Sequence, residues 1–402
     1  FVNPMMGLVS LKGLANPPFY PLAVDKVRLV GDPVAIVVAE TRAIAEDARQ
    51  MVEVDYEPLP PVATFEQALA DDAPLLWEGE KTNIMFGDTH SHGDVDGVFA
   101  AADRVVTETF TQHRYANVPM ETLGVVAEVD PAGEVTVHAA TQAPHMLSLV
   151  LGMTVRKVPL RRSLLTLARN RGQLGRLFRA VRELLAQSPE LKGAMGNTLP
   201  TMLSQFARHP SRMWHLTRAS MPLVGDMDAT APRVKAAPDI GGAFGVKGFA
   251  HREEVATVAA AAERGRTVKW VEDRKARLLT PGQAREEKLD VSAAVTNQGR
   301  IMGMKVAMVM DQGAYPGIPF PGAFFSGIIR TVMPGPYRLE AFQFDTTVVA
   351  SNKATYVAYR GPWEVETWVR ERMVDVIARQ LGADPVEVRR LNMYAPESLP
   401  AK

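Results

Sequence analysis

Three closely spaced glycines in the segment 239–247 constrain the fold of this chain more than any other feature. Gly241, Gly242 and Gly245 follow an apolar lead-in that ends at Ile240, and an Ala-rich helical pattern from His251 to Arg264 comes after them. Glycine accepts positive φ and lets another molecule approach the backbone closely. A strand, a glycine turn and a helix N-terminus together form a corner that favours anions. The spacing matches neither the dinucleotide fingerprint nor the P-loop, so a plain structural turn is the alternative.

Composition narrows the classes of protein. The 402 residues suffice for two or three domains, and 47% hydrophobic with 22% charged residues is ordinary for a globular protein. Lys plus Arg and Asp plus Glu both total 45, so charge gives no argument for nucleic-acid binding. No cysteine is present, which excludes disulfides, thiolate zinc sites, cysteine-ligated clusters and cysteine nucleophiles within this chain. No apolar run reaches the roughly 18 residues of a membrane span, and no signal peptide is visible. We expect a cytoplasmic protein whose two ends are both cut.

The N-terminal part predicts a compact α+β unit over about residues 20–72. Alternating and apolar runs predict strands at 26–30, 34–39 and 52–56, and Thr41 can cap a helix that ends at Gln50. A polar linker rich in Gly, Asp and His follows, around Gly87 to Gly97.

The remainder predicts a sheet and two terminal helices. Residues 104–111, 124–129 and 135–140 are expected to form strands of one antiparallel sheet. Further strands are expected at 268–271, 288–295, 301–310 and 341–350, with turn chemistry at 297–299. A helix is predicted over about 363–381, with Gly382 just past its end, and Asp384 can cap a short last helix.

Five motifs in a fixed order resemble the xanthine dehydrogenase and aldehyde oxidase family. The segments 27–35 and 53–60 resemble its small α/β hammerhead domain. Four further stretches are similar to its molybdenum-binding subunit: 141–145, 241–247, 311–316, and the pair 358–361 with 381–392. Each is weak alone, and together they are specific. The resemblance is greatest to bacterial enzymes whose molybdenum subunit is a separate chain, such as aerobic carbon monoxide dehydrogenase.

The resemblance implies an α+β fold of two parts. A hammerhead domain, N-terminally incomplete, is expected over residues 1–75. A mixed α+β molybdenum-cofactor-binding domain is expected over 76–402, with a helical insertion at about 156–233. The family's second molybdopterin-binding domain, and its catalytic glutamate in a Gly-x-Gly-Glu context, match nothing here. We expect both to lie outside this chain, as a truncation or the other half of a split subunit, so the chain alone should not catalyse.

The resemblance also implies a chemistry. Such enzymes hydroxylate an aldehyde or nitrogen heterocycle with water as oxygen donor, and pass electrons to iron–sulfur and FAD subunits, often as a dimer of heterotrimers. The cofactor is a molybdenum-pterin, with the cytosine dinucleotide form expected of this subgroup. No side chain binds the metal directly, so no metal ligand is expected from this chain. The protein positions and tunes the cofactor instead.

The resemblance also assigns roles to individual residues of this chain, according to their positions in the motifs. Gln142 matches a glutamine whose amide hydrogen-bonds a molybdenum oxygen; the alternative is an amide that satisfies backbone groups. Gly241, Gly242, Ala243, Phe244 and Gly245 match the loop beside the metal, and ordinary core packing is the alternative for Phe244. Arg360 and Gly361 match a second cofactor loop. The alternative for Arg360 is an ion pair with Glu364 or Glu366. Glu121 is interpreted as structural.

Departures from the family pattern bear on the substrate. Carbon monoxide dehydrogenases carry a cysteine in the loop at 360–363, and this chain has none. Purine enzymes carry a glutamate just beyond the lysine of the glycine loop, where Gly248 and Phe249 stand here. Carbon monoxide and purines are therefore disfavoured.

The insertion at about 156–233 is basic and contains two amphipathic stretches, 164–185 and 201–217. It could pack on its own protein with a solvated basic face, dock on a partner subunit or contact an anionic membrane.

Two functions stay open. One is part of a molybdenum-dependent hydroxylase. The other is an inactive remnant, or a nucleotide- or cofactor-binding module that kept the fold.

Overall fold

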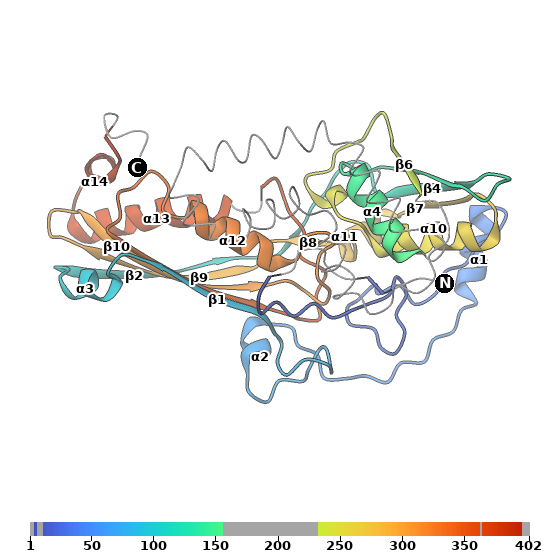
Figure 1. The fold of residues 1–402 in the computed structure, drawn as a ribbon. Helices are drawn as coiled ribbons and strands as arrows, with labels where there is room; N and C mark the ends of the chain where they lie inside the picture. Colours follow the sequence, from blue (N-terminus) through green and yellow to red (C-terminus); the bar gives the residue numbers. More distant parts are fainter. Residues whose placement is uncertain (1–3, 6–10, 156–231, 362–363, 396–402) are drawn as a thin grey trace, which may run out of the picture.

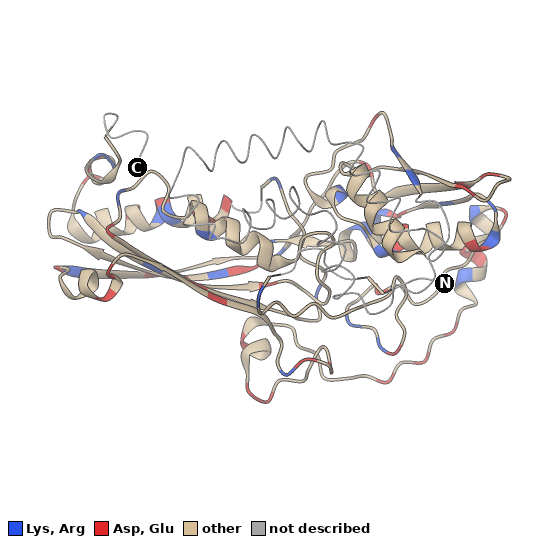
Figure 2. Cartoon of the chain, in the orientation of Figure 1, with Lys and Arg blue, Asp and Glu red and all other residues tan. Residues whose placement is uncertain are grey.

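Two β-sheets lie along one elongated molecule in the computed structural model, which describes residues 4–5, 11–155, 232–361 and 364–395 (Figure 1). The basic insertion predicted at about 156–233 lies almost wholly outside the described residues. No helix in the described ranges is long and apolar enough to cross a membrane. Basic and acidic side chains are interspersed over the described elements (Figure 2).

The larger sheet has five strands in the order β1-β11-β10-β9-β2. Its strands are β1 (Ile84–His92), β2 (Arg104–Gln112), β9 (Glu287–Val295), β10 (Ile301–Asp311) and β11 (Ala341–Val349). β10 and β11 run parallel, and the other neighbours run antiparallel. Helices α12 (Gly322–Val332) and α13 (Glu364–Leu381) cover one face, and α14 (Pro385–Asn392) follows α13.

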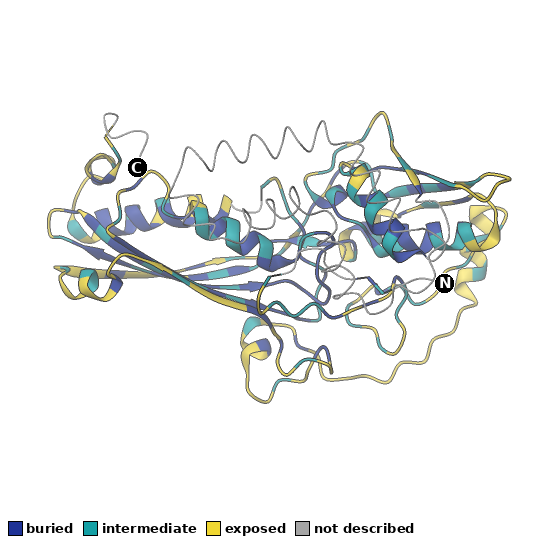
Figure 3. Cartoon of the chain, viewed as in Figure 1, coloured by how far each residue is buried: buried dark blue, intermediate teal, exposed yellow. Residues whose placement is uncertain are grey.

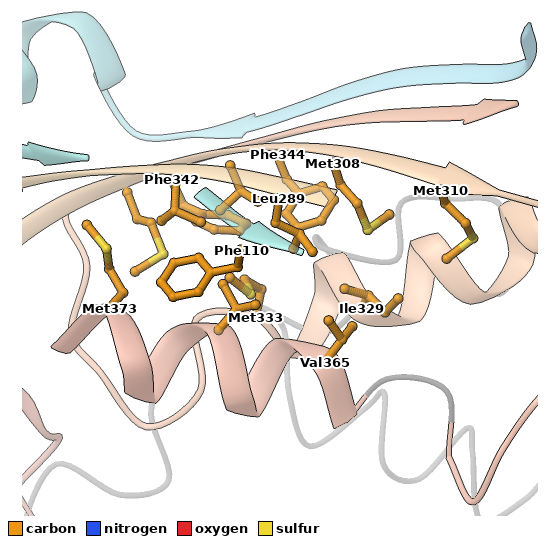
Figure 4. Packing of buried hydrophobic residues seen from close by; sticks show 14 of the residues in the cluster. Phe110, Leu289, Met308, Met310, Ile329, Met333, Phe342, Phe344, Val365 and Met373 are labelled. Atoms are coloured by element: carbon orange, nitrogen blue, oxygen red, sulfur yellow. The ribbon is translucent and has the colours of Figure 1, made fainter. Parts of the chain in front are cut away.

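Alternation along the strands explains this packing. Successive strand residues point to opposite faces, and in β9 the side chains of Leu289, Val291 and Ala293 turn to the helices and are buried. Phe344 and Met308 meet them from the neighbouring strands, while helix residues close the layer (Figure 4). A fully buried side chain of this size contributes about 1.5–3 kcal/mol.

The smaller sheet has four strands in the order β6-β5-β4-β7. Its strands are β4 (Gly124–Val129), β5 (Val135–Ala139), β6 (Arg233–Ala236) and β7 (Val268–Val271), packed with helices α4 (Pro144–Thr154) and α10 (Arg252–Arg264). The helix predicted from His251 to Arg264 is confirmed. His251 and Glu254 form a capping box at its start, and Gly265 ends it with φ 61°.

Short elements join the two sheets. They are β3 (Tyr115–Ala116) paired with β8 (Gln283–Ala284), the 3₁₀ turn η1 (Val246–Gly248) and α11 (Arg274–Leu279). After β2 the chain leaves the larger sheet and forms β3, and the strands at 124–129 and 135–140 then belong to the smaller sheet. The prediction that these two strands share one antiparallel sheet with 104–111 was therefore wrong.

The prediction of a polar linker at about 87–97 was also wrong. Most of it is the edge strand β1, and α3 (Val95–Ala100) follows with Asp94 as its cap. An edge strand is solvated on one side, so it carries polar side chains along its outer half. Its sequence therefore resembles a linker.

The N-terminal unit is only partly as predicted. Helix α1 (Arg42–Gln50) is present with Thr41 as its cap, and α2 (Phe65–Leu69) follows. The strands predicted at 26–30, 34–39 and 52–56 are absent. Near the first, the Arg28 N–H donates to Asp32 at 2.7 Å, so the backbone forms a local turn. The other two have no ladder partner among the described residues, and the whole segment is largely exposed (Figure 3).

The remaining strand, turn and cap predictions, from residue 104 to the last helix, are confirmed. Seven predicted strands match β2, β4, β5, β7, β9, β10 and β11 within two residues. Gly299 takes φ 89° in the turn between β9 and β10. Gly382 has φ 65° after α13, and the Asp384 side chain accepts the Val386 N–H at the start of α14.

Candidate functional site

The glycine loop and the loop at Arg360 lie against each other, although more than a hundred residues separate them. Gly245 has φ 104°, and a Cβ built there would lie 2.7 Å from the carbonyl carbon of Ala358. The Arg360 N–H donates to the Phe244 carbonyl at 3.3 Å. Only glycine permits this backbone-to-backbone approach together with that φ. The two loops that the sequence assigned to one cofactor are thus one structural unit.

Asn117 fastens the two loops together. Its Nδ2 donates to the carbonyls of Phe244 and Ala358, both at 2.8 Å, and its side chain is buried. One amide therefore satisfies a carbonyl from each loop. Sequence reasoning missed this residue because nothing in its local pattern marks it.

Phe244 is not an ordinary core residue. Its side chain is 42% exposed and its φ is +49°, which is unusual for a bulky residue. Its ring stacks on Tyr359 at 6.2 Å, and Tyr359 meets Tyr115 edge-on at 5.3 Å. The aromatic ring therefore stands at the surface of the two joined loops, where a bound group can contact it.

Gln142 lies beside the far end of the glycine loop. Its backbone N–H donates to the Lys247 carbonyl at 3.1 Å, and a Cβ on Gly248 would lie 3.6 Å from its side-chain carbons. Its amide is exposed and makes no hydrogen bond within the described part of the chain. The alternative of an amide that satisfies backbone groups is therefore not what the structure has.

Glu121 ties the start of the glycine loop to its end. Its carboxylate accepts the Gly241 N–H at 3.1 Å and the Lys247 ammonium at 2.6 Å. Partial burial alone would raise the pKa of Glu121, but these two hydrogen bonds outweigh it and lower that pKa. The Lys247 side chain is fully buried. The structural interpretation of Glu121 agrees with this geometry, which closes the loop.

Gly242 adds the remaining contact of the glycine loop. It has φ 88°, and a Cβ there would meet the Phe244 ring at 3.3 Å. Ala243 lies between them and is partly buried. Gly241 leaves no room either, since its Cβ would lie 2.7 Å from Glu121 Cβ. Side chains at these positions would press on Glu121 or on the Phe244 ring, so glycine keeps the loop in this conformation.

Arg360 presents a charge without an acidic partner in the described ranges. Its alternative partners are engaged elsewhere: Glu364 pairs with Arg285 at 3.1 Å and Glu366 with Arg370 at 2.8 Å. The Arg360 residue is exposed and has φ 46°, and Gly361 follows with φ 85°. The ion pair considered from sequence is therefore absent, and the guanidinium stays available to a bound anion.

Buried ionisable groups lie near the glycine loop. The His251 Nε2–H donates to the Val246 carbonyl at 2.8 Å, and burial lowers the pKa of His251 to about 4, so the ring is neutral. Burial raises the pKa of Glu254 to about 8 and that of Glu272 to about 7. Within the described ranges, no group of three or more His, Asp or Glu side chains is placed to hold a metal ion.

Comparison with protein families identifies this arrangement. The model described as "Molybdopterin cofactor-binding domain" matches residues 76–162 and 209–393, which together are more than half of the chain. The model described as "Aldehyde oxidase and xanthine dehydrogenase, a/b hammerhead domain" matches residues 8–60. The chain belongs to the molybdopterin-binding large-subunit family of xanthine dehydrogenase, aldehyde oxidase and carbon monoxide dehydrogenase. The resemblance inferred from the five motifs is confirmed.

Individual relatives agree with the family. The chain is 30% identical to subunit gamma of the 6-hydroxypseudooxynicotine dehydrogenase complex of Paenarthrobacter nicotinovorans, over 94% of this chain and 38% of the relative. It is also 30% identical to the carbon monoxide dehydrogenase large chain of Hydrogenophaga pseudoflava, over 94% and 40% respectively. The structure of quinoline 2-oxidoreductase from Pseudomonas putida 86 matches with a TM-score of 0.74 and 26% identity, over 99% of this chain and 42% of that one.

These shares have a consequence for function. The chain spans about two fifths of the length of the relatives that it matches. One of these relatives is a subunit of a complex, and another is a large chain. The family therefore is that of large subunits in enzymes with several subunits.

Proposed function

We propose that this chain is the cofactor-positioning part of a molybdenum-dependent hydroxylase. The observation that carries the proposal is the junction of the glycine loop with the Arg360 loop, with Gln142 beside it. The loops at Gly245 and Arg360 contact each other, and Gln142 contacts the far end of the glycine loop at Lys247 and Gly248. Their exposed amide, ring and guanidinium are the groups that a polar, partly anionic cofactor needs.

The residues present fit a molybdenum-pterin group. Glycine at 242 and 245 keeps the two loops in contact, because a Cβ at Gly242 would meet the Phe244 ring and one at Gly245 would force the loops apart at Ala358. The Gln142 amide and the Arg360 guanidinium have no competing partner among the described residues. The family's cofactor can therefore be received without displacing an internal hydrogen bond of either side chain.

Each residue then has a defined task. Gln142 donates from its amide without adding charge, and Arg360 supplies a positive charge for the pterin's phosphates or for charge that develops in the pocket. Phe244 offers an apolar face that orients a flat substrate and excludes water. Gly241, Ala243 and Gly361 contribute backbone surface to the same loops. When bound, the molybdenum-pterin supplies oxygen transfer from water and accepts two electrons. The cytosine dinucleotide form of the pterin is part of the proposal.

The wider assignment follows from the family. We propose an aldehyde or N-heterocycle as substrate, and iron–sulfur and FAD subunits as electron acceptors in a dimer of heterotrimers in the cytoplasm. The division into a hammerhead domain at 1–75 and a cofactor domain at 76–402 is also proposed. Two relatives named for 6-hydroxypseudooxynicotine and nicotine favour an N-heterocyclic compound.

The second candidate is an inactive remnant or cofactor-binding module of the same fold. It is carried by the match of residues 76–162 and 209–393 to the molybdopterin cofactor-binding domain, which concerns binding and not turnover. The two candidates agree on cofactor binding and differ on turnover.

The test uses the protein that carries this chain, produced with its partner subunits in a host that makes the molybdenum cofactor. Molybdenum is measured by mass spectrometry and pterin by fluorescence after oxidation. Gly245→Val should remove both, while Gly265→Ala, a glycine change at the end of α10 where no heavy atom lies within 4 Å of the added carbon, should remove neither. Bound cofactor with reduction of a dye by heterocycles or aldehydes supports the hydroxylase. Bound cofactor without turnover supports the module, and absence of cofactor from the unaltered protein refutes both.

A further inference from the structure

All four non-glycine residues that take positive φ in the described ranges gather around the two joined loops. Phe244 and Arg360 belong to the loops themselves, with φ 49° and 46°. The other two, Arg285 and Glu286, are consecutive, with φ 70° and 82°. They lie between β8 and β9, and no motif from the sequence includes them. Two successive bulky residues in this region are strained, and such strain persists only where surrounding contacts determine the backbone.

The contacts of Arg285 show what holds this backbone. Its guanidinium is buried, and Nη2 donates to the Tyr359 carbonyl at 3.0 Å and to the Gly361 carbonyl at 3.4 Å. These carbonyls are immediately before and after Arg360. The planar fork of arginine suits two acceptors at once, whereas a lysine ammonium is a point charge. Arg285 therefore fixes the backbone of the second loop on both sides of its exposed charge.

The same side chain also reaches the aromatic surface. Its Nε donates to the Tyr115 hydroxyl at 3.0 Å. Tyr115 meets Tyr359 edge-on, and Tyr359 stacks on Phe244 of the glycine loop. A fourth contact, to the Glu364 carboxylate at 3.1 Å, ties the guanidinium to the start of α13. One buried cation thus connects β3, both loops and a helix of the larger sheet.

The neighbouring Glu286 anchors the strained turn from the opposite side. Its carboxylate pairs with Arg114 and Lys353, and its carbonyl accepts the Asp311 N–H at 3.1 Å. Arg114 in turn donates to the Asp311 carbonyl at 2.7 Å. These bonds fix the backbone from which the Arg285 side chain projects. The strain at the turn is therefore maintained by contacts on both sides.

We infer that Arg285 is the positioning residue of the Arg360 loop, which it holds in the conformation that receives the cofactor. The inference rests on the proposed function for what the loop receives, but the hold on the loop is a property of this chain alone. Arg285 contacts neither Arg360's guanidinium nor the exposed face of Phe244 in any bond described above. It acts through backbone carbonyls and through two tyrosines.

The matched control is Arg370, another buried arginine. It donates to the Val332 and Met333 carbonyls at the end of α12, at 3.1 and 3.3 Å, and pairs with Glu366 of α13, and it holds no carbonyl of the two loops. Arg285→Met and Arg370→Met each remove a buried guanidinium that holds two carbonyls, together with one carboxylate for Arg285 and two, Glu366 and Glu371, for Arg370. A general loss of stability would affect both variants. A positioning role is specific to the first.

Two readouts test the inference on the whole protein with its partner subunits. Hydrogen exchange is measured by mass spectrometry on peptides that cover 355–361, in protein freed of cofactor, and molybdenum and pterin are measured per chain as isolated. We expect Arg285→Met to speed exchange in this peptide at least tenfold and to lower cofactor content by a similar factor. Arg370→Met should change neither, and Arg285→Lys should recover exchange protection only in part.

Different results would contradict the inference and the proposed function. Unchanged exchange in 355–361 for Arg285→Met would overturn the inference, as would equal effects of Arg370→Met. If the unaltered protein contains no molybdenum or pterin, the proposed function fails. The exchange comparison then still decides whether Arg285 positions the loop.

Discussion

Replacing Asn117 by alanine should lower both the free energy of unfolding and the amount of bound cofactor. The change removes two hydrogen bonds from a buried amide to the Phe244 and Ala358 carbonyls. Each such bond contributes about 0.5–1.5 kcal/mol, and a buried carbonyl left without a donor adds to the loss. Gly245 already lies against Ala358, so the carbonyls have little room to turn towards water. We therefore expect Asn117→Ala to lower the free energy of unfolding by about 2–3 kcal/mol.

The assay separates this effect from a general loss of stability. Urea unfolding followed by circular dichroism gives the free energy, and molybdenum and pterin content give the state of the site. Asn392 provides a matched control, because its buried amide donates to the Gly299 and Val388 carbonyls, both at 2.8 Å, away from the two loops. Asn392→Ala should lose comparable stability and keep the cofactor.

A closer probe keeps the shape of Asn117. Asn117→Asp replaces the donating amide by a carboxylate that faces two carbonyl oxygens, so it should be at least as destabilising as alanine at pH 7. The reasoning is refuted if Asn117→Ala unfolds within 0.5 kcal/mol of the unaltered protein, since the amide would then not fasten the loops. It is also refuted if Asn392→Ala loses the cofactor to the same degree.

Three further changes test other parts of the molecule. Gly245→Ala imposes backbone strain of about 1–3 kcal/mol at φ 104° and pushes against Ala358, so it should lower urea stability and pterin content together. Asp32→Asn leaves a buried ion pair broken and weakens the 2.6 Å bond from the Tyr315 hydroxyl; it should cost about 3 kcal/mol in urea unfolding, and a loss below 1 kcal/mol would contradict this. Burial raises the pKa of Glu254 to about 8, so its contribution to stability is present below about pH 4.5 and is lost as pH rises through 8. Glu254→Gln should therefore gain stability relative to the unaltered protein between pH 5 and 8.5, and a constant difference across that range would refute the assignment.

The sequence predicted the elements whose pattern is local. Strands such as β9 and β10 alternate strongly because one face meets helices, and α13 ends at Gly382 as glycine punctuation predicts. The strands expected at 34–39 and 52–56 alternate equally well. A strand also needs a neighbour for its ladder bonds, and no described segment supplies one. Alternation alone therefore could not separate a paired strand from an exposed extended segment.

The candidate site divides in the same way. Gln142, Phe244 and Arg360 could be named from sequence because the family pattern marks their positions, and the structure brings their loops together. Asn117 and Arg285 could not be named, because their importance lies in bonds to carbonyls more than seventy residues away. Such bonds leave no trace in spacing or periodicity. A buried polar side chain that satisfies two backbone segments at once is visible only when both segments are in place.

The position of the site follows from how the two sheets are joined. Along the chain β3 follows β2 and β8 precedes β9, and β3 and β8 pair with each other outside the larger sheet. Asn117 and Arg285, whose side chains hold the two loops, come directly after these two strands. The smaller sheet contributes the glycine loop through β6 and α10, while the larger sheet contributes the Arg360 loop just before α13. The bonds from Asn117 and from the Arg360 N–H to the Phe244 carbonyl join the glycine loop to segments that flank the larger sheet, whereas the Arg285 bonds hold the Arg360 loop within the larger sheet's own side. Separation of the sheets should therefore part the glycine loop from the Arg360 loop before either hydrophobic core is lost, so cofactor binding should fail at a lower urea concentration than the helical signal.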